Sequence, residues 1–208
     1  MVARLDHTTV VAPSLEAGAA YVEAALGVLP DPGRTHPDMA THNLLLALGT
    51  DVYLEVISAN PDAVPVKRPR WFGLDDGLVG STTRLAAWVA STDDIAEAAV
   101  PELGDVVTMR REDHSWRMTV RPDGSLPFGG AAPLLIQRSS RVSPAAALPP
   151  RSLVLQRLLI RHPAPIQVAA LFARIGLASL SIAVTEGNEC SLVAEIQTPF
   201  GLRMLGET

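Results

Sequence analysis

The sequence predicts an α+β protein in which helices lie outside a curved, mostly antiparallel sheet with a cleft on its inner face. Two observations support this fold class. The order strand, helix, strand, strand occurs three times along the 208 residues, at a spacing of roughly 65–80 residues, which is longer than solenoid periods. Hydrophobic residues make up 48% of the chain and charged residues 19%, which is the composition of a folded globular protein.

The first unit begins with a strand from Arg4 to Val11, which is rich in β-branched residues. Ser14 is a suitable N-cap for the helix that follows, and Gly27 is a suitable residue to end it. A loop rich in Pro and Gly is then expected over residues 29–39. Two strands flank the next tight turn: His42 to Leu48 and Val52 to Ser58.

The second unit repeats this order, because Arg84-Leu85 opens its first strand as Arg4-Leu5 opens the strand of the first unit. Asp94 is predicted to cap a short helix that runs through Leu103 and ends at Gly104. Three strands are predicted after this helix: Val106 to Arg110, Trp116 to Arg121 and Pro133 to Arg138.

These units predict the domain organisation. Residues 1–140 are expected to form one domain with modules at about 3–59 and 83–138. Residues 141–152 are rich in Ser, Pro and Ala and are expected to form a linker. Residues 153–208 are expected to form a third, βαββ-type module packed on the same domain.

Composition excludes several classes of protein. The formal net charge of −5 disfavours a nucleic-acid partner. No uninterrupted apolar run approaches the roughly 18 residues of a membrane span, and no secretory signal is evident. Cys190 is the only cysteine, so the expected compartment is the reducing cytoplasm. The expected partner is a small molecule, bound by a monomer or a homodimer.

Two polar side chains within predicted strands are the main candidates for chemistry. His7 and Glu55 both lie mid-strand among apolar neighbours, where a carboxylate is costly to bury unless it is paired, ligated or facing a wet cavity. A His and a Glu on neighbouring strands form half of a divalent-metal site. The alternative is that Glu55 pairs with an arginine and His7 is a hydrogen-bonded strand residue.

Four segments carry a resemblance to a known family: Leu5-Asp6-His7, His36-Pro37-Asp38-Met39-Ala40-Thr41-His42-Asn43, Tyr53-Leu54-Glu55-Val56-Ile57 and Trp71-Phe72-Gly73-Leu74. Together they resemble a glyoxalase-like domain of the vicinal oxygen chelate superfamily, which includes glyoxalase I, bleomycin-resistance proteins and extradiol dioxygenases. The resemblance covers residues 3–75 well, and the remainder up to about residue 205 matches in its repeat pattern alone.

The resemblance implies a duplicated βαβββ module whose sheets curve around a metal-centred cleft. His7 and Glu55 fall on the ligand positions of the first module. In the second module Ala87 stands where a His is expected, and Gln137 is a neutral oxygen donor at about the place of a carboxylate. The implied cofactor is one divalent ion (Zn, Ni, Mn or Fe) held by His7, Glu55 and Gln137, or none.

Further residues are candidates for roles around the cleft. His42 is predicted to reach the cleft rim as a general base or substrate contact. Tyr53, Trp71 and Phe72 are predicted to line the substrate pocket. The remaining histidines are expected to pack, to end strands or to be exposed: His36, His114 and His162.

Three functions remain open at this level. The first is a metal-assisted lyase or isomerase that acts on a small oxygenated molecule and stabilises an enolate-like intermediate. The second is a metal-free protein that binds or sequesters a small molecule in the same cleft, which Ala87 and Gln137 favour. The third is a structural or partner-binding module of degenerate fold.

Overall fold

The computed structural model describes residues 2–77, 81–111, 114–140 and 142–206. Residue 141, which begins the predicted linker, residue 1 of the predicted domain 1–140, and residues 207 and 208 of the predicted third module lie outside this part. Among the described residues, none of the helices is long and apolar enough to cross a membrane.

Two modules with the same order of elements form one large sheet. The first contains β1 (Arg4–Val11), α1 (Leu15–Leu26), β2 (Asp31–His36), β3 (Thr41–Ala47) and β4 (Tyr53–Ala59). The second contains β5 (Arg84–Ser91), α2 (Ile95–Ala98), β6 (Asp105–Arg111), β7 (His114–Val120) and β8 (Leu134–Arg138).

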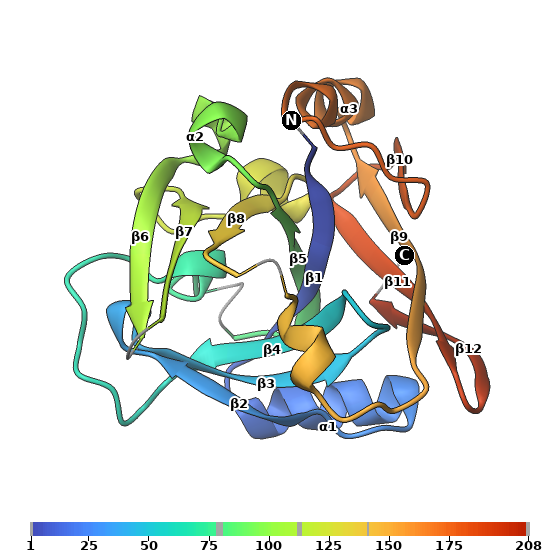
Figure 1. The fold of residues 1–208 in the computed structure, drawn as a ribbon. Helices are drawn as coiled ribbons and strands as arrows, with labels where there is room; N and C mark the ends of the chain where they lie inside the picture. Colours follow the sequence, from blue (N-terminus) through green and yellow to red (C-terminus); the bar gives the residue numbers. More distant parts are fainter. Residues whose placement is uncertain (1, 78–80, 112–113, 141, 207–208) are drawn as a thin grey trace.

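The strands of the large sheet lie in the order β2-β3-β4-β1-β5-β8-β7-β6, and the sheet is strongly curled (Figure 1). Most neighbours are antiparallel, whereas β1 pairs with β4 and β5 pairs with β8 in parallel. The predicted α+β class, with a curved and mostly antiparallel sheet, is therefore confirmed.

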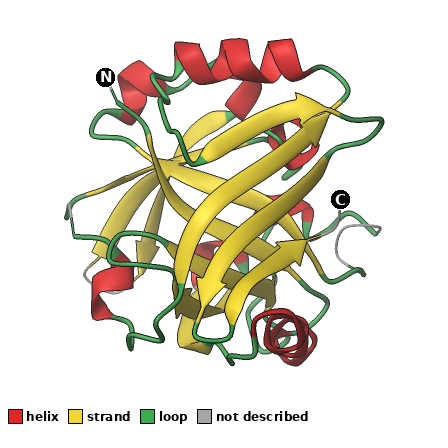
Figure 2. Ribbon diagram, turned by 90° about the vertical axis from the view of Figure 1, so that its right-hand side faces the viewer, coloured by secondary structure: helices red, strands yellow, loops and turns green. Residues whose placement is uncertain are grey.

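The third unit forms a smaller sheet that faces the viewer in Figure 2. It contains β9 (Val154–His162), α3 (Pro165–Arg174), β10 (Ile182–Glu186), β11 (Ser191–Thr198) and β12 (Gly201–Gly206), with strand order β10-β9-β11-β12. The unit is βαβββ rather than βαββ, because β12 pairs with β11 along its whole length. Both sheets share a core, in which the Trp88 and Phe172 rings meet edge to face at 5.4 Å.

Helix α1 packs on the face of the large sheet that lies opposite Glu55. Its N-cap is Ser14, whose Oγ accepts a hydrogen bond from the Ala17 N–H at 3.2 Å. Gly18 allows the helix to approach β4 closely, since a Cβ at this position would lie 2.2 Å from Val56 Cγ1. Val56 and Glu55 are adjacent on β4, so they point to opposite faces of the sheet.

Two elements differ from the sequence-based expectation. Part of the expected loop over 29–39 is the edge strand β2, where Pro32 is tolerated because an edge strand need not donate every N–H. Helix α2 ends at Ala98 rather than at Leu103, because Pro101 forces Val100 into an extended conformation (φ −123°, ψ 152°).

Candidate functional site

A cavity of about 690 Å³ lies on the inner face of the curled sheet. Charged and polar groups gather in one part of its wall: His7, Asn43, Tyr53, Glu55 and Arg138. Aromatic and aliphatic side chains cover most of the rest, among them Trp71, Phe72, Trp116, Met118 and Ile136. A concave site that is mostly apolar, with a few convergent polar groups, is typical of small-molecule binding.

His7 and Glu55 meet across the parallel pair β1 and β4. Thr9 is the strand partner of Glu55, and His7 is the partner of Tyr53, so both side chains project into the cavity from neighbouring strands. His7 Nε2 lies 3.5 Å from Glu55 Oε2, and both residues are about 95% buried, with 4% and 5% of their surface exposed. The Tyr53 ring stacks on the His7 ring at a centroid distance of 4.5 Å.

Asp6 reaches the other side of the His7 ring because β1 is irregular at this point. The pairing of β1 with β5 shifts between Leu5 and His7, so that Asp6 is the extra residue of a β-bulge. Its Oδ1 lies 2.6 Å from His7 Nδ1, although adjacent strand residues ordinarily point to opposite faces. The bulge therefore places His7 between two carboxylates.

Arg138 of β8 completes a cluster of four ionisable groups with Asp6, His7 and Glu55. Its guanidinium binds both carboxylate oxygens of Asp6, and the Nη2–Oδ1 distance is 2.9 Å. Nη2 also donates to the Tyr53 hydroxyl at 3.0 Å. With two carboxylates and two cations the buried cluster has no net charge when all four groups are ionised, which is the condition that makes burial of charge tolerable.

The pKa values of these groups follow from their contacts. Burial alone would raise the pKa of Asp6, but the hydrogen bonds and charges of His7 and Arg138 lower it from 3.8 to about 2. Burial would lower the pKa of His7, yet Asp6 and Glu55 outweigh it and raise this pKa above 6.5. Burial would raise the pKa of Glu55, but His7 in particular lowers it. The two shifts have opposite directions, so both favour a protonated His7 beside an ionised Glu55 in the range between their ordinary values of 4.5 and 6.5.

Asn43 holds Glu55 from the neighbouring strand β3. Its Oδ1 accepts a hydrogen bond from the Arg34 N–H at 2.7 Å, which assigns the amide orientation and leaves the NH₂ group to face the carboxylate. Asn43 Nδ2 donates to Glu55 Oε1 at 2.6 Å. One carboxylate oxygen is thus occupied, and Oε2 is the oxygen that faces His7.

The structure places Tyr53, Trp71 and Phe72 on the cavity wall. Trp71 is fixed by its indole N–H, which donates to Thr41 Oγ1 at 3.2 Å. Phe72 adopts a left-handed conformation with φ 57°, which turns its ring toward Trp71 at a centroid distance of 5.5 Å. His36, expected from the sequence to pack within a loop, also lines the cavity between the Trp71 and Trp116 rings.

His42 and Gln137 lie elsewhere. On β3 the cavity is lined by Asn43 and Leu45, so His42 points to the opposite face, where it lies in a shallow groove beside Leu15 and Leu44. The expectation that His42 reaches the cleft rim is wrong, because the strand alternation has the other phase.

Gln137 likewise lies on the outer face of β8, since Ile136 and Arg138 line the cavity. Its amide oxygen accepts hydrogen bonds from Arg117 and from the Ile95 N–H, and its NH₂ group donates to the Asp93 carbonyl. The structure therefore does not bring Gln137 to His7 and Glu55.

His7 and Glu55 provide part of the set of ligands that a divalent ion needs. His7 Nε2 and Glu55 Oε2 are close enough to share one ion, and Asp6 supports His7 Nδ1 as the outer partner of a ligating histidine does. No third His, Cys, Asp or Glu joins them among the described residues. The corresponding positions in the second module are Ala87 and Leu134, both in the apolar cluster that borders the cavity. These residues do not fit an ion held by three or four side chains.

Sequence reasoning missed Asp6, Asn43 and Arg138. Asp6 escaped because alternation assigns it to the opposite face from His7, and the bulge that overrides alternation has no signal in the sequence. Asn43 follows His42 directly, so a correct phase for β3 would have found it. Arg138 lines the cavity, but its direct partner is Asp6, so the structure does not show the expected alternative in which an arginine pairs with Glu55.

A duplicated βαβββ module, whose strands form one curled sheet around a polar and aromatic cavity, defines a protein of the vicinal oxygen chelate class. The chain belongs to the glyoxalase-like domain family, whose model matches residues 5–176. No curated protein matches the chain.

Several solved structures resemble this fold. A hypothetical protein from Staphylococcus aureus has a TM-score of 0.64 and 11% identity, with 91% of this chain and 88% of that chain covered. Methylmalonyl-CoA epimerase from Streptomyces coelicolor has a TM-score of 0.45 and 18% identity over 69% of this chain and 100% of its own. BphC, a halotolerant catechol dioxygenase, has a TM-score of 0.45 and 11% identity over 94% of this chain and 68% of its own. At these identities the likeness concerns the fold alone.

Proposed function

We propose that this protein is an isomerase or lyase that moves a proton at a carbon atom next to a carbonyl group. The observation that carries the proposal is the buried His7–Glu55 pair, which faces a large and mostly apolar cavity. A base must be ionised and an acid must be protonated at the same pH, and the opposite pKa shifts of Glu55 and His7 produce this combination.

In the proposed reaction Glu55 takes the proton from carbon, and the electrons of the broken C–H bond move to the carbonyl oxygen. The protonated His7 donates a hydrogen bond to the resulting enolate oxygen. Return of a proton to the opposite face of that carbon, or to a neighbouring carbon, re-forms the carbonyl group and gives an isomer. In a lyase the enolate electrons re-form the carbonyl group, a double bond forms between the α- and β-carbons, and the bond from the β-carbon to the leaving group breaks. Asn43 keeps the Glu55 carboxylate in position through its 2.6 Å hydrogen bond.

The sequence-based proposal of metal assistance loses support from the donor set, because Ala87 and Leu134 stand where further ligands are needed. The polarising charge in our proposal comes instead from protonated His7, with Arg138 balancing Asp6. No step of the proposed reaction is routed through an ion.

The test is deuterium exchange at carbon, followed by proton NMR in D₂O with acetophenone, phenylpyruvate and acetoacetate as carbonyl compounds. Loss of a general base lowers the rate by roughly 10²–10⁴-fold, so we expect exchange with the wild type and its loss in Glu55→Gln. Glu195→Gln, in β11 of the smaller sheet, is the matched control and keeps the wild-type rate. Exchange that survives Glu55→Gln overturns the proposal.

A second candidate is a protein that binds a small molecule without transforming it. The apolar walls favour it, since Trp71, Trp116 and Met118 provide a surface for an aromatic ligand whether or not the polar groups react. If some of the carbonyl compounds bind saturably and none of them exchanges a carbon-bound proton for deuterium, the protein binds its ligand without transforming it.

The proposed location and partners follow from fewer observations. Cys190 is a free thiol, which is usual in a reducing compartment, and we place the protein in the cytoplasm on this basis. A small molecule is the partner that the cavity favours, with the protein as a monomer or homodimer.

A further inference from the structure

The segment expected to be a linker forms part of the cavity wall. Residues Pro144–Ala147 make a short 3₁₀ turn, and Leu148 and Pro149 follow it. Pro144, Ala147, Leu148 and Pro149 all line the cavity. The turn lies in front of β3 and β4 in Figure 1, so a connection between modules closes one side of the site.

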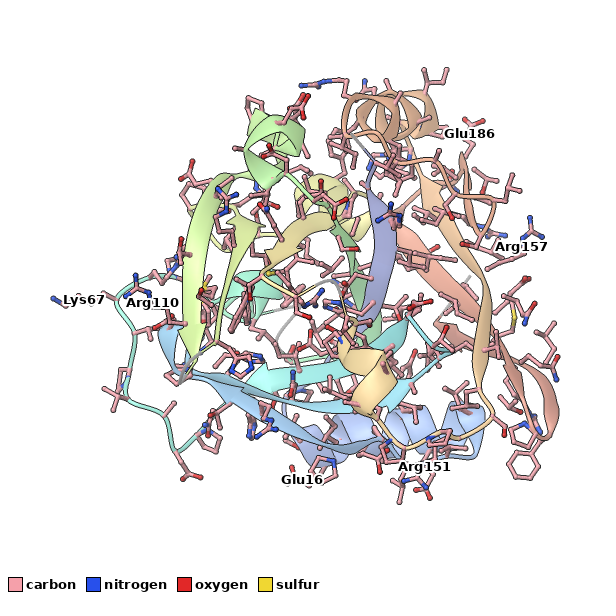
Figure 3. All side chains as sticks on the ribbon, viewed as in Figure 1. Glu16, Lys67, Arg110, Arg151, Arg157 and Glu186 are labelled. Carbon is pink, nitrogen blue, oxygen red and sulfur yellow. The ribbon has the colours of Figure 1, made fainter. Side chains whose placement is uncertain are left out.

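This segment, which we call the roof (residues 143–149), has hydrogen bonds within its turn and an attachment to β2 just beyond its C-terminal end. Ser143 caps the turn, because its Oγ accepts a hydrogen bond from the Ala145 N–H at 3.2 Å, and the Leu148 N–H donates to the Ala145 carbonyl at 3.1 Å. Beyond the turn, Arg151 Nη2 donates to Asp31 Oδ1 of β2 at 2.5 Å. Arg151 is labelled below the turn in Figure 3. The roof is therefore a regular turn that is connected to β2 by one ion pair.

The four roof residues that line the cavity are all apolar, and aromatic and aliphatic side chains cover much of the other walls. The buried charged cluster lies on β1, β4 and β8, where His7, Glu55 and Arg138 reach the cavity and Asp6 supports them from behind. Four further polar side chains line the cavity away from the cluster: Asp31, Arg34, His36 and His114. A ligand that fits this distribution has an apolar body and one oxygen-bearing end. A volume of about 690 Å³ lies within the 300–1,000 Å³ that drug-sized ligands occupy.

We infer that the roof determines ligand specificity and that the site takes a bulky aromatic carbonyl compound rather than a molecule of two or three carbons. This inference rests on the proposed function for the orientation of the ligand, whose carbonyl faces His7 and Glu55. The roof then covers the apolar body, and changes in the roof alter affinity without touching the reacting groups.

Two alanines of the turn provide a matched pair of variants. Ala147 lines the cavity, whereas Ala146, its neighbour, is exposed and does not. Ala147→Trp therefore fills the cavity, and Ala146→Trp adds the same side chain outside it. Both positions are exposed at the surface, so neither change needs the core to repack.

The experiment is titration of each protein with 2-acetylnaphthalene, a neutral aromatic ketone, followed through the fluorescence of Trp71 and Trp116. An indole that occupies part of the cavity competes with the ligand for space, so Ala147→Trp should weaken binding roughly 5- to 150-fold, which is about 1–3 kcal/mol. Ala146→Trp should change affinity by less than about twofold. The new tryptophan of each variant also fluoresces. The dissociation constants are therefore checked in a second experiment, in which unlabelled ketone competes with radiolabelled ketone for the protein.

Equal affinities for the two variants overturn the inference, as does a wild type that binds pyruvate but not the naphthyl ketone. The proposed function fails differently. If no carbonyl compound exchanges its proton while Ala147→Trp still weakens binding, the roof assignment stands and catalysis does not. If small ketones exchange and the aromatic ketone does not bind, catalysis stands and the roof assignment does not.

Discussion

Ala87 occupies the position in β5 that His7 occupies in β1. The two strands are antiparallel, and His7 pairs with Val89 as Thr9 pairs with Ala87, so an approximate two-fold axis exchanges the two positions. The same operation relates Glu55, the partner of Thr9, to Leu134, the partner of Val89. The second module therefore contributes a methyl group and an isobutyl group where the first contributes an imidazole and a carboxylate.

This asymmetry separates the two halves of the cavity by chemistry. The first module, with Arg138 of β8, holds all four charges of the buried cluster. The apolar cluster that contains Ala87 and Leu134 continues into Met118 and Ile136, which line the cavity. A ligand is thus offered a charged end and an apolar end, and this is the basis of both proposals.

The first prediction concerns metal. Within the part of the chain that the structure describes, no group of three or more His, Cys, Asp or Glu side chains could hold a metal ion. We therefore expect the purified wild type to contain far less than one divalent ion per chain by elemental analysis. Treatment with EDTA should leave Tm and ligand binding unchanged. A stoichiometric content of zinc, nickel, manganese or iron that disappears in His7→Ala would contradict this expectation.

The second prediction concerns Asp6. Asp6→Asn keeps the shape of the side chain but leaves Arg138 and protonated His7 without a carboxylate between them. Removing one partner of a buried ion pair costs about 3–5 kcal/mol, and urea unfolding should show a loss of stability of this size. Asp123→Asn is the control: Asp123 pairs with Arg121 at the surface, and its loss should cost less than about 1 kcal/mol. Equal losses for the two variants would argue against the buried cluster.

The third prediction concerns pH. Asp6 and Glu55 have lowered pKa values, so the stability they contribute is present above their ordinary values of 3.8 and 4.5 and is lost as the pH falls through the folded values. His7 has a raised pKa, so its contribution is present below 6.5 and is lost as the pH rises through the folded value. The cluster should therefore stabilise the fold most between about pH 4.5 and 6.5.

Urea unfolding at several pH values checks this expectation. In His7→Gln the decline that begins near neutral pH should disappear, because His7 is the member of the cluster whose raised pKa starts from 6.5. Tyr53 and Arg138 also have raised pKa values, but these start from 10.0 and 12.5 and act only at much higher pH. His42→Gln, on the opposite face of the sheet, should keep the wild-type profile. An unchanged decline near neutral pH in His7→Gln would assign it to another group.

Parts of the fold and the site could be predicted because they follow local rules. The β-branched residues of β1, the Ser14 cap and Gly27 identified the first strand and helix, and mid-strand polarity singled out His7 and Glu55. These signals depend on one segment at a time. Strand β2 was missed because Pro32 and Gly33 are typical of turns, and only pairing with β3 makes the segment a strand.

The errors have a common physical origin in the phase of strand alternation. A period of two does not say which face is inside, so alternation on β3 allows either His42 or Asn43 to face the cavity, and the structure places Asn43 there. The resemblance implied Gln137 as a ligand, but Ile136 and Arg138 are the residues of β8 that face inward. The strand partner of Val89 shows that Leu134 is the counterpart of Glu55, and such pairings between distant segments are not visible in one sequence. The roof could not be predicted either. Its composition is that of a linker, and its place on the cavity wall depends on contacts with distant segments.

The last prediction concerns the contact that supports β4 from behind. Gly18→Ala would place a Cβ 2.2 Å from Val56 Cγ1 and 3.1 Å from Ala12 Cβ. Val56 is fully buried and β-branched, so it cannot rotate away, and overpacking of about 1–3 kcal/mol should exceed the roughly 1 kcal/mol that alanine gains over glycine in a helix. Gly77→Ala, with no atom within 4 Å of the new Cβ, should be close to neutral. In the double variant Gly18→Ala with Val56→Ala the clash is removed. The loss of unfolding free energy in the double variant should therefore be smaller than the sum of the losses in the two single variants. If the losses are simply additive, α1 does not press on the strand that carries Glu55.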